Sequence, residues 1–545
     1  EMLFKIRAKH GFKIVNLNTN EIPFRNFNNP SSLNRYNKTQ KPITDLITES
    51  KKSFIMLSAP TGLGKSLICA MSAYTLSNKI NYVCSDKQLQ DQLLNDFPEA
   101  VVLKGRGNYT CNLFPHLNAD TCVGQCAEYK AKEIQCNYYD KKAELLNADF
   151  RILNTFYLLF EMNYAGQLKG QDLIIIDEAD TLDLNFISFV SLQVSDSLIR
   201  KYDLGYPKLT VVESWIDWAG DSIIKLEKSY NSENCKNSLD PEFVKADKLI
   251  KKLKLFILLV EDDWIYNRHN TYSEFKPVWI TKELIQKYLF SHADRFILCS
   301  ASLPPKATIC NTLMIDPADC DYIEVGSSFL PENRKVIYEP VMDMSFKNKE
   351  KYMTMIDYVG IVLDRHATEK GIIHCQSYAL RDLIMEIGGN RLITHESKDK
   401  QKQLHIFYNS TEPLVFVSPS CVRGLSLNDD KARFGICVKM PFPNLGDKAI
   451  SKRCYGSGNK GKMWYNSETA QAVLQMSGRH VRFHTDWGVM YILDSCFERV
   501  RKCLPKWFND DIVEDFDYGE EEDQAKCPEL VNAGITQPDE DDFDY

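Results

Sequence analysis

The segment "SFIMLSAPTGLGKSLICAMSAYTL", residues 53–76, changes its pattern twice within a short length. It begins with the apolar run 54–57, passes through a turn that contains glycine, and continues with apolar residues at helical spacing. This pattern predicts a buried strand, a loop and a helix, which is the first half of a βαβ unit. Backbone N–H groups of such a loop and of the helix N-terminus form a cradle for phosphate groups.

Four residues of this loop are suited to a nucleotide. Gly62 and Gly64 allow the backbone to approach a phosphate closely. Lys65 would reach the terminal phosphates, and Ser66 would ligate magnesium. Ala59 stands where the strict pattern has its first glycine. The alternative is a bare turn without a ligand, but the flanking strand and helix favour nucleotide binding.

The segment "DLIIIDEAD", residues 172–180, predicts a buried strand that ends in acids. Asp177 would hold the magnesium through water, and Glu178 would polarise the attacking water. A solvated acidic start of a helix is the alternative. Four apolar residues precede the acids, and paired carboxylates at the end of a buried strand require a metal or a substrate, so the strand is favoured.

Further segments predict two parallel sheets. Strands at 82–84 and 295–302 would extend the first sheet, and the polar, helix-rich stretch 186–285 would interrupt it. A second α/β set begins near residue 335, with candidate strands at 371–375, 413–418, 434–440 and 488–494. The expected fold class is α/β, with two parallel-sheet domains of which the first carries two inserts.

The segment "QMSGRHVR", residues 475–482, lies in the second set. Arg479 and Arg482 are three residues apart, so on a helix they project from one face, where guanidinium groups suit a transferring phosphoryl group. Arginine pairs with this spacing are common on protein surfaces, so a functional interpretation depends on where the pair lies in the fold. A nucleotide on the first sheet and arginines on the second would make hydrolysis depend on domain closure.

The ordered set of motifs resembles the superfamily 2 helicases, specifically the iron–sulfur XPD/DinG group. The resemblance covers roughly residues 36–510. It rests on "APTGLGKS" as motif I, "VCSDKQLQDQLLNDF" as motif Ia, "DEAD" as motif II, "CSASLPP" as motif III, "IIHCQSYALRDLI" as motif IV, "VRGLSL" as motif V and "QMSGRHVR" as motif VI.

The resemblance implies ATP and Mg²⁺ as cofactors and two RecA-like domains. Gln40 in "YNKTQKP" stands where this family has the glutamine that reads adenine. The implied catalytic residues are Lys65, Asp177, Glu178, Gln475, Arg479 and Arg482.

Some positions depart from the family pattern. Asp180 ends motif II where histidine is more usual, and Ser302 replaces the threonine of motif III. Arg423 and Ser426 stand in motif V where the group usually has two acids. Because serine supplies no carboxylate, the coupling between nucleotide and strand at this loop is in question.

Four cysteines lie between motifs Ia and II, where this family has its cluster insert. Cys111, Cys122, Cys126 and Cys136 could close a [4Fe–4S] cluster within one loop-rich segment. The alternative is a structural zinc site, which usually consists of two close pairs, whereas only Cys122 and Cys126 are close here. Basic and aromatic residues around the cysteines would contact a DNA strand or form ordinary surface: Arg106, Tyr109, Tyr129, Lys130, Lys132, Tyr138 and Tyr139.

Charge is distributed unevenly along the chain. From Val513 onward the chain has thirteen acidic residues and one basic residue, Lys526, which gives a net charge of -12. Because the whole chain has a net charge of -8, the residues before Val513 carry +4. The acidic composition predicts a disordered tail. Two further roles are considered for it: it occupies a positive DNA channel when no strand is bound, or it docks on a protein partner. No apolar run approaches the ~18 residues that span a bilayer, so no membrane association is expected.

The expected division is 1–104, 141–185 and 286–318 for the first RecA-like domain, 105–140 for the iron–sulfur insert, 186–285 for an arch-like helical insert, 319–512 for the second RecA-like domain and 513–545 for the acidic tail. Only residues 1–35 precede the helicase region, so a nuclease domain ahead of it is not expected.

The resemblance implies an ATP-dependent DNA helicase that moves 5′ to 3′ on single-stranded DNA and acts on forked or tailed duplex, with the RNA-DNA hybrid as a further substrate. It would act in DNA repair or replication, in the cytoplasm of a bacterial-type or virus-infected cell or in a nucleus. Two alternatives remain open: an ATP-driven translocase or remodeller with little unwinding, and a nucleic-acid-binding module that does not hydrolyse ATP.

Overall fold

The computed structural model describes residues 39–84, 87–121, 134–230, 241–327, 329–387, 389–420, 427, 429–478, 481 and 486–514. The chain forms two compact units. The first unit comprises Glu1–Ser328, Phe442–Leu474 and Cys503–Pro505, and the second comprises Phe329–Pro441, Gln475–Lys502 and Lys506–Tyr545. The following predicted residues lie outside the described part: Cys122, Cys126, Tyr129, Lys130, Lys132, Arg423, Ser426, Arg479, Arg482 and the tail from 515.

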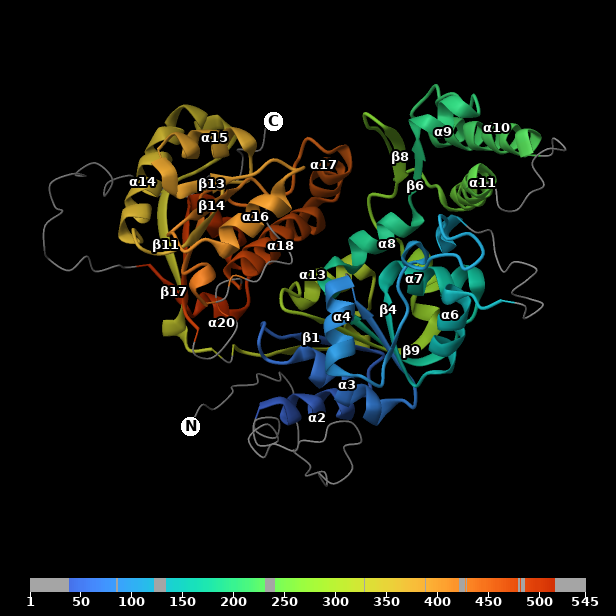
Figure 1. The fold of residues 1–545 in the computed structure, drawn as a ribbon, viewed down its shortest axis with the longest axis horizontal. Coiled ribbons are helices and arrows are strands. Elements are labelled where there is room, and N and C mark those ends of the chain that lie inside the picture. Colours follow the sequence, from blue (N-terminus) through green and yellow to red (C-terminus); the bar gives the residue numbers. More distant parts are fainter. Residues whose placement is uncertain are drawn as a thin grey trace, which may run out of the picture. The chain divides into compact units, whose positions relative to one another are not determined.

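The first unit contains a seven-stranded sheet in the order β10-β1-β9-β5-β2-β4-β3 (Figure 1). Its strands are β1 (Phe54–Ser58), β2 (Ile80–Cys84), β3 (Val101–Val102), β4 (Phe150–Asn154), β5 (Gln171–Asp177), β9 (Ala293–Ser300) and β10 (Cys320–Glu324). Every pair is parallel. Because the carboxyl ends of parallel strands share one edge, the loop after β1 and the acids after β5 lie at the same edge.

Side chains of this sheet alternate between two helical layers. Ile55, Leu57 and Tyr82 face the layer of α2 (Lys41–Glu49), α3 (Lys65–Leu76) and α4 (Lys87–Asp96). Met56 and Val83 face the opposite layer, which contains α6 (Asn137–Asn147), α7 (Thr155–Phe160), α8 (Leu182–Val190), α12 (Lys282–Tyr288) and α13 (Lys306–Leu313). This is the period of two that a strand buried on both faces requires.

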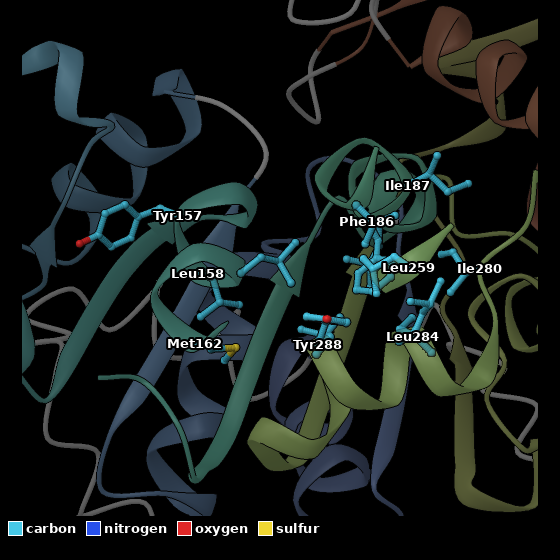
Figure 2. Packing of buried hydrophobic residues seen from close by; sticks show 14 of the residues in the cluster. Tyr157, Leu158, Met162, Phe186, Ile187, Leu259, Ile280, Leu284 and Tyr288 are labelled. Carbon is cyan, nitrogen blue, oxygen red and sulfur yellow. The ribbon is translucent and has the colours of Figure 1, made fainter. Parts of the chain in front are cut away.

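Figure 2 shows part of the second layer from close by. Apolar side chains of α7 and the π-turn Glu161–Ala165, of α8 and of α12 pack together there: Tyr157, Leu158, Met162, Phe186, Ile187, Leu284 and Tyr288. Full burial of a large apolar side chain contributes about 1.5–3 kcal/mol. This packing therefore holds α8, the helix that follows Asp177, against α7 and α12.

The stretch 186–285 contains helices and also a small sheet. Its helices include α9 (Asp196–Lys201), α10 (Val212–Tyr230) and α11 (Pro241–Leu259), and the antiparallel strands are β6 (Leu192–Ser195), β7 (Ile265–Arg268) and β8 (Tyr272–Lys276) in the order β6-β8-β7. Phe275 of β8 packs against Trp215, Trp218 and Phe256, with ring centroids 5.5, 5.3 and 5.0 Å away. The helix-rich reading of this stretch did not predict the sheet.

The second unit contains another parallel sheet of seven strands, in the order β13-β14-β12-β15-β16-β11-β17. Its strands are β11 (Arg334–Met342), β12 (Gly371–His374), β13 (Leu392–Thr394), β14 (Val415–Ser418), β15 (Phe434–Cys437), β16 (Gly488–Asp494) and β17 (Ile512–Val513). One core forms against α14 (Tyr352–Arg365) and α15 (Tyr378–Glu386), and a smaller one against α16 (Lys400–Asn409). Short helices α19 (Glu498–Arg501) and α20 (Lys506–Asn509) follow β16. The predicted α/β fold with two parallel sheets is confirmed.

Two further helices, α17 (Lys448–Tyr455) and α18 (Gly458–Ser477), follow β15 in the chain. Residues Phe442–Leu474, which include α17 and most of α18, belong to the first unit, a grouping that sequence order does not predict. None of the helices in the described ranges is long and apolar enough to cross a membrane.

Candidate nucleotide site and cysteine segment

The loop between β1 and α3 has the backbone of a phosphate cradle. Gly62 and Gly64 both have a φ of 83°, in the left-handed region that strains other residues. Gly64 is the N-cap of α3 and offers no side chain to cap the helix, so the first N–H groups of α3 face the loop without a side-chain cap. A helix N-terminus in this state attracts anions.

Lys65 and Ser66 are the first two residues of α3, and both side chains are half-buried. Among the described residues, the Lys65 ammonium has no hydrogen-bond acceptor and no acidic partner. An unpaired ammonium next to an uncapped helix start is suited to bind the terminal phosphates of a nucleotide.

Asp177 is the last residue of β5 and is 4% exposed. Its Oδ2 accepts a hydrogen bond from the Tyr82 hydroxyl at 2.8 Å. Its Oδ1 accepts one from the Glu178 backbone N–H at 2.9 Å and lies 3.5 Å from Sγ of Cys299. The carboxylate is therefore held by donors from β2, β5 and β9. Burial, followed by the charge of Asp177, raises the pKa of Tyr82 well above its ordinary value.

Glu178 follows with a φ of 54°, which is left-handed for a residue that carries a side chain. Such a backbone costs on the order of 1–3 kcal/mol and is concentrated at functional sites. The Glu178 side chain is half-buried. This agrees with a specialised role for the position that the sequence predicts to polarise water.

The two residues that depart from the family pattern in motifs II and III, Asp180 and Ser302, contact each other. Asp180 is 4% exposed and Ser302 is 1% exposed. Oγ of Ser302 donates to Oδ2 of Asp180 at 3.0 Å, and Oγ of Ser300 donates to Oδ1 at 2.8 Å. A serine in place of threonine therefore keeps the hydroxyl that this aspartate needs.

Gln40 lies against the nucleotide loop. Its Nε2 donates to the carbonyl oxygen of Leu63 at 2.8 Å, and the same atom fills the space that a Cβ on Gly64 would need. The structure thus brings Gln40 to the loop, while its reading of adenine stays a prediction. Gln475 is half-buried near the end of α18 and belongs to the second unit.

Sequence analysis missed the carboxylate at the end of β16. Asp494 is 2% exposed and accepts backbone N–H groups of Met344, Cys496 and Met440 at 3.2, 3.0 and 2.7 Å. Burial raises its pKa. Asp343 and Cys496 lie close enough to join it in holding a metal ion, but three backbone donors already satisfy Asp494. The apolar run of β16 that ends in an acid was the available signal.

The two described cysteines of the predicted cluster lie at the base of the insert. Cys111 and Cys136 are both half-buried. A hydrogen bond joins their neighbours in the chain. Nδ2 of Asn137, next to Cys136, donates to the carbonyl oxygen of Thr110, next to Cys111, at 3.3 Å. Nε of Arg106 donates to Ala119 at 2.9 Å, which closes the same base. The segment beside Cys111 is therefore hydrogen-bonded to the segment beside Cys136.

The aromatic residues near the cysteines are partly in the core. Tyr138 is 4% exposed, stacks edge-on against Tyr109 and Tyr139, and its hydroxyl lies 3.3 Å from that of Tyr157. The guanidinium of Arg106 lies 5.1 Å from the Tyr138 ring centroid. The prediction that Tyr138 forms part of a DNA-contacting surface is wrong, because its ring is buried beneath Arg106.

Comparison with known proteins agrees with this geometry. Residues 365–511 match the family model described as a helicase C-terminal domain. ATP-dependent DNA helicase CHL1 of Debaryomyces hansenii is 23% identical over 390 residues, which cover 63% of this chain and 45% of that protein. The solved structure titled XPD_Helicase aligns with 88% of this chain and 99% of its own, with a TM-score of 0.61 and 16% identity. The chain is similar in sequence and in fold to helicases of the XPD group.

Other XPD-like helicases show the same pattern of similarity. The regulator of telomere elongation helicase 1 homolog of Drosophila ananassae is 37% identical over 95 residues, 15% of this chain and 10% of that protein. The S. tokodaii Xpd4 structure covers 88% of this chain and 99% of its own, with a TM-score of 0.57 and 14% identity. The chain spans less than half the length of these curated relatives. The predicted resemblance to the XPD group is confirmed.

Proposed function

We propose that the chain is an ATP-dependent DNA helicase that hydrolyses ATP with Mg²⁺ and moves along single-stranded DNA, in the 5′ to 3′ direction. One observation carries the proposal: an uncapped, glycine-bearing loop with Lys65 lies at the same sheet edge as a buried carboxylate, Asp177, whose orientation is fixed by three donors. A fixed, buried carboxylate beside a phosphate cradle is the arrangement that phosphoryl transfer requires.

The residues of this edge fit Mg²⁺. Asp177 supplies a carboxylate, to which the Tyr82 phenol donates, and Ser66 supplies a hydroxyl, both oxygen donors of the kind that Mg²⁺ prefers. When bound, Mg²⁺ would neutralise charge on the phosphates. Lys65 would hold the terminal phosphates, and Glu178 would orient the water that attacks. Arg479 and Arg482, with Gln475, would complete the site from the second of two RecA-like domains.

The cysteine segment is proposed to hold a [4Fe–4S] cluster, with zinc as the alternative. The joined chain next to Cys111 and Cys136 supports a metal at the base of the insert, because a small segment without its own core needs such a cross-link. The helices and small sheet of 186–285 would then serve as the arch-like insert. DNA as the substrate implies that the protein acts inside a cell.

DNA-stimulated ATP hydrolysis tests the proposal. Wild type should hydrolyse ATP faster when single-stranded DNA is added, and Lys65→Ala should abolish turnover. Lys51→Ala, at an exposed lysine that precedes β1, is the matched control and should behave as wild type. Absence of hydrolysis by the wild type under anaerobic, magnesium-containing conditions would contradict an ATPase and favour a binding module. The same ATPase with little strand displacement would favour a translocase or remodeller.

A further inference from the structure

Tyr82 is a fully buried tyrosine of β2 whose side chain reaches the end of a neighbouring strand. Its backbone pairs with Ile175 of β5, two residues before Asp177. Two residues of a parallel strand span roughly 6.6 Å. The phenol ring covers this distance, and its hydroxyl ends 2.8 Å from Oδ2 of Asp177. A shorter polar side chain at this position would not extend as far along the sheet.

The Tyr82 side chain also lies on the face of the sheet that packs against α3, the helix that follows the nucleotide loop. Tyr82, Ile175 and Cys299 belong to the layer of side chains that faces α3, so one phenol lies between the sheet and the helix that begins at Lys65.

The remaining contacts of Asp177 leave its second oxygen dependent on Tyr82. Oδ1 has the Glu178 N–H and the Cys299 thiol. Among the described residues, Oδ2 has the Tyr82 hydroxyl as its donor. Without that hydroxyl the carboxylate would keep its position in the chain but would lose the donor that sets its rotation.

We propose that Tyr82 is a positioning residue that sets the geometry of the magnesium–nucleotide site by orienting the Asp177 carboxylate. This rests on the proposed function, because it assigns a role toward the Mg²⁺ of an ATPase. A buried phenol needs some acceptor in any protein, and a backbone carbonyl would satisfy it. Here its acceptor is instead the carboxylate that is expected to hold the metal.

The test compares Tyr82→Phe with Tyr352→Phe. Tyr352 is also buried, and its hydroxyl donates to the carbonyls of Met344 and Ser345 in the second unit, so the control loses a similar buried hydroxyl elsewhere. Binding of a fluorescent ADP analogue is measured with Mg²⁺ and with EDTA. Loss of a group that orients a metal ligand typically costs 10–100-fold in metal affinity.

Tyr82→Phe should therefore weaken analogue binding by about tenfold or more with Mg²⁺ and by less than about twofold with EDTA. Tyr352→Phe should change neither value. An equal loss in both buffers, or no loss in either, would overturn the role of Tyr82. If wild type binds the analogue equally with Mg²⁺ and EDTA and hydrolyses no ATP, the proposed function fails as well, so the two failures are distinguishable.

A double variant keeps the test independent of folding losses. Tyr82→Phe added to Asp177→Asn should cause no further loss of Mg²⁺-dependent binding, because Tyr82 acts through that carboxylate. Additive losses would contradict the proposal. Thermal midpoints without nucleotide, which a structural role alone would lower, should fall equally for Tyr82→Phe and Tyr352→Phe.

Discussion

Ser302 donates a hydrogen bond from Oγ to Oδ2 of Asp180 at 3.0 Å, and both side chains are buried. The bond joins the segment after β5 to the loop after β9, and Ser300 completes it by donating to the other oxygen of the same carboxylate at 2.8 Å. Two positions that each depart from the family pattern thus form one interaction. The pair links the acidic end of β5 to the strand that separates it from the nucleotide loop.

Replacement of Ser302 tests this link. Ser302→Ala should lower the free energy of unfolding by about 1–3 kcal/mol, because it removes a hydrogen-bond donor from a buried carboxylate. It should also lower the rate of ATP hydrolysis. Ser302→Thr retains the hydroxyl and is the matched control, expected near wild type in both measurements. Equal losses for Ala and Thr would mean that packing, and not the hydroxyl, matters at this position.

The buried ion pair between Arg453 and Asp183 predicts a larger effect on stability. Nη2 of Arg453 lies 2.7 Å from Oδ2 of Asp183, and its guanidinium lies 4.1 Å from the rings of both Trp279 and Trp464. Both charged side chains are 4% exposed. Arg453→Met should cost about 3–5 kcal/mol in chemical denaturation, because it strands the Asp183 charge.

A second change provides the control for that pair. Adding Asp183→Asn to Arg453→Met should recover part of the lost stability, since no buried charge then lacks a partner. If the double variant lost the sum of the two single losses, the ion pair would not be the source of the effect. Arg453→Lys keeps the charge but not the flat group between the indoles, and should fall between wild type and Arg453→Met.

Sequence patterns predicted the elements whose cause is local. The strand, loop and helix of 53–76 and the acid-terminated β5 follow from short runs of apolar residues and from glycine. The small sheet of β6, β7 and β8 was not predicted, because its strands are four or five residues long and carry charges such as Arg268 and Glu274.

Contacts between residues that are far apart in the sequence could not be predicted from it. Arg453 and Asp183 are 270 residues apart, and nothing near either residue specifies the other. Tyr82 lies in a strand that reads as ordinary core, so its hydroxyl gave no signal of a role at the nucleotide site. Burial of Tyr138 was missed for the converse reason, since charged neighbours made it resemble a surface residue.

A pH dependence is expected from Asp511. It forms an ion pair with Arg334, whose guanidinium also lies over Trp507, but burial raises the pKa of Asp511 to about 6. The folded state therefore binds this proton more tightly than the unfolded state, and stability from this group falls as pH rises from about 4 to 6. Between pH 5 and pH 7 the loss should be about 1 kcal/mol.

Denaturation of Asp511→Asn at the two pH values measures this contribution. Asparagine does not titrate, so the variant should lack the part of the pH dependence that comes from position 511. Asp510→Asn, at the exposed neighbour, is the control and should retain it. An identical change from pH 5 to pH 7 in wild type and Asp511→Asn would contradict the raised pKa.

Metal content tests the cysteine segment. Anaerobically purified wild type should be brown and contain about four irons per chain. Cys136→Ser should lose the iron and much of the strand displacement while keeping some basal ATPase, because the nucleotide loop lies outside the insert. Cys503→Ser, at another half-buried cysteine, should keep the metal. One zinc per chain in a colourless preparation would replace the cluster with a structural zinc site.

Strand displacement tests the central claim most directly. Labelled duplexes with a 5′ tail, a 3′ tail or a fork, and an RNA-DNA hybrid, are incubated with wild type and with Lys65→Ala in the presence of ATP and Mg²⁺. Wild type should release the labelled strand from the 5′-tailed and forked substrates and much less from the 3′-tailed one, while Lys65→Ala should release none. Displacement by Lys65→Ala equal to wild type, or none by a wild type that hydrolyses ATP on DNA, would contradict an ATP-driven helicase.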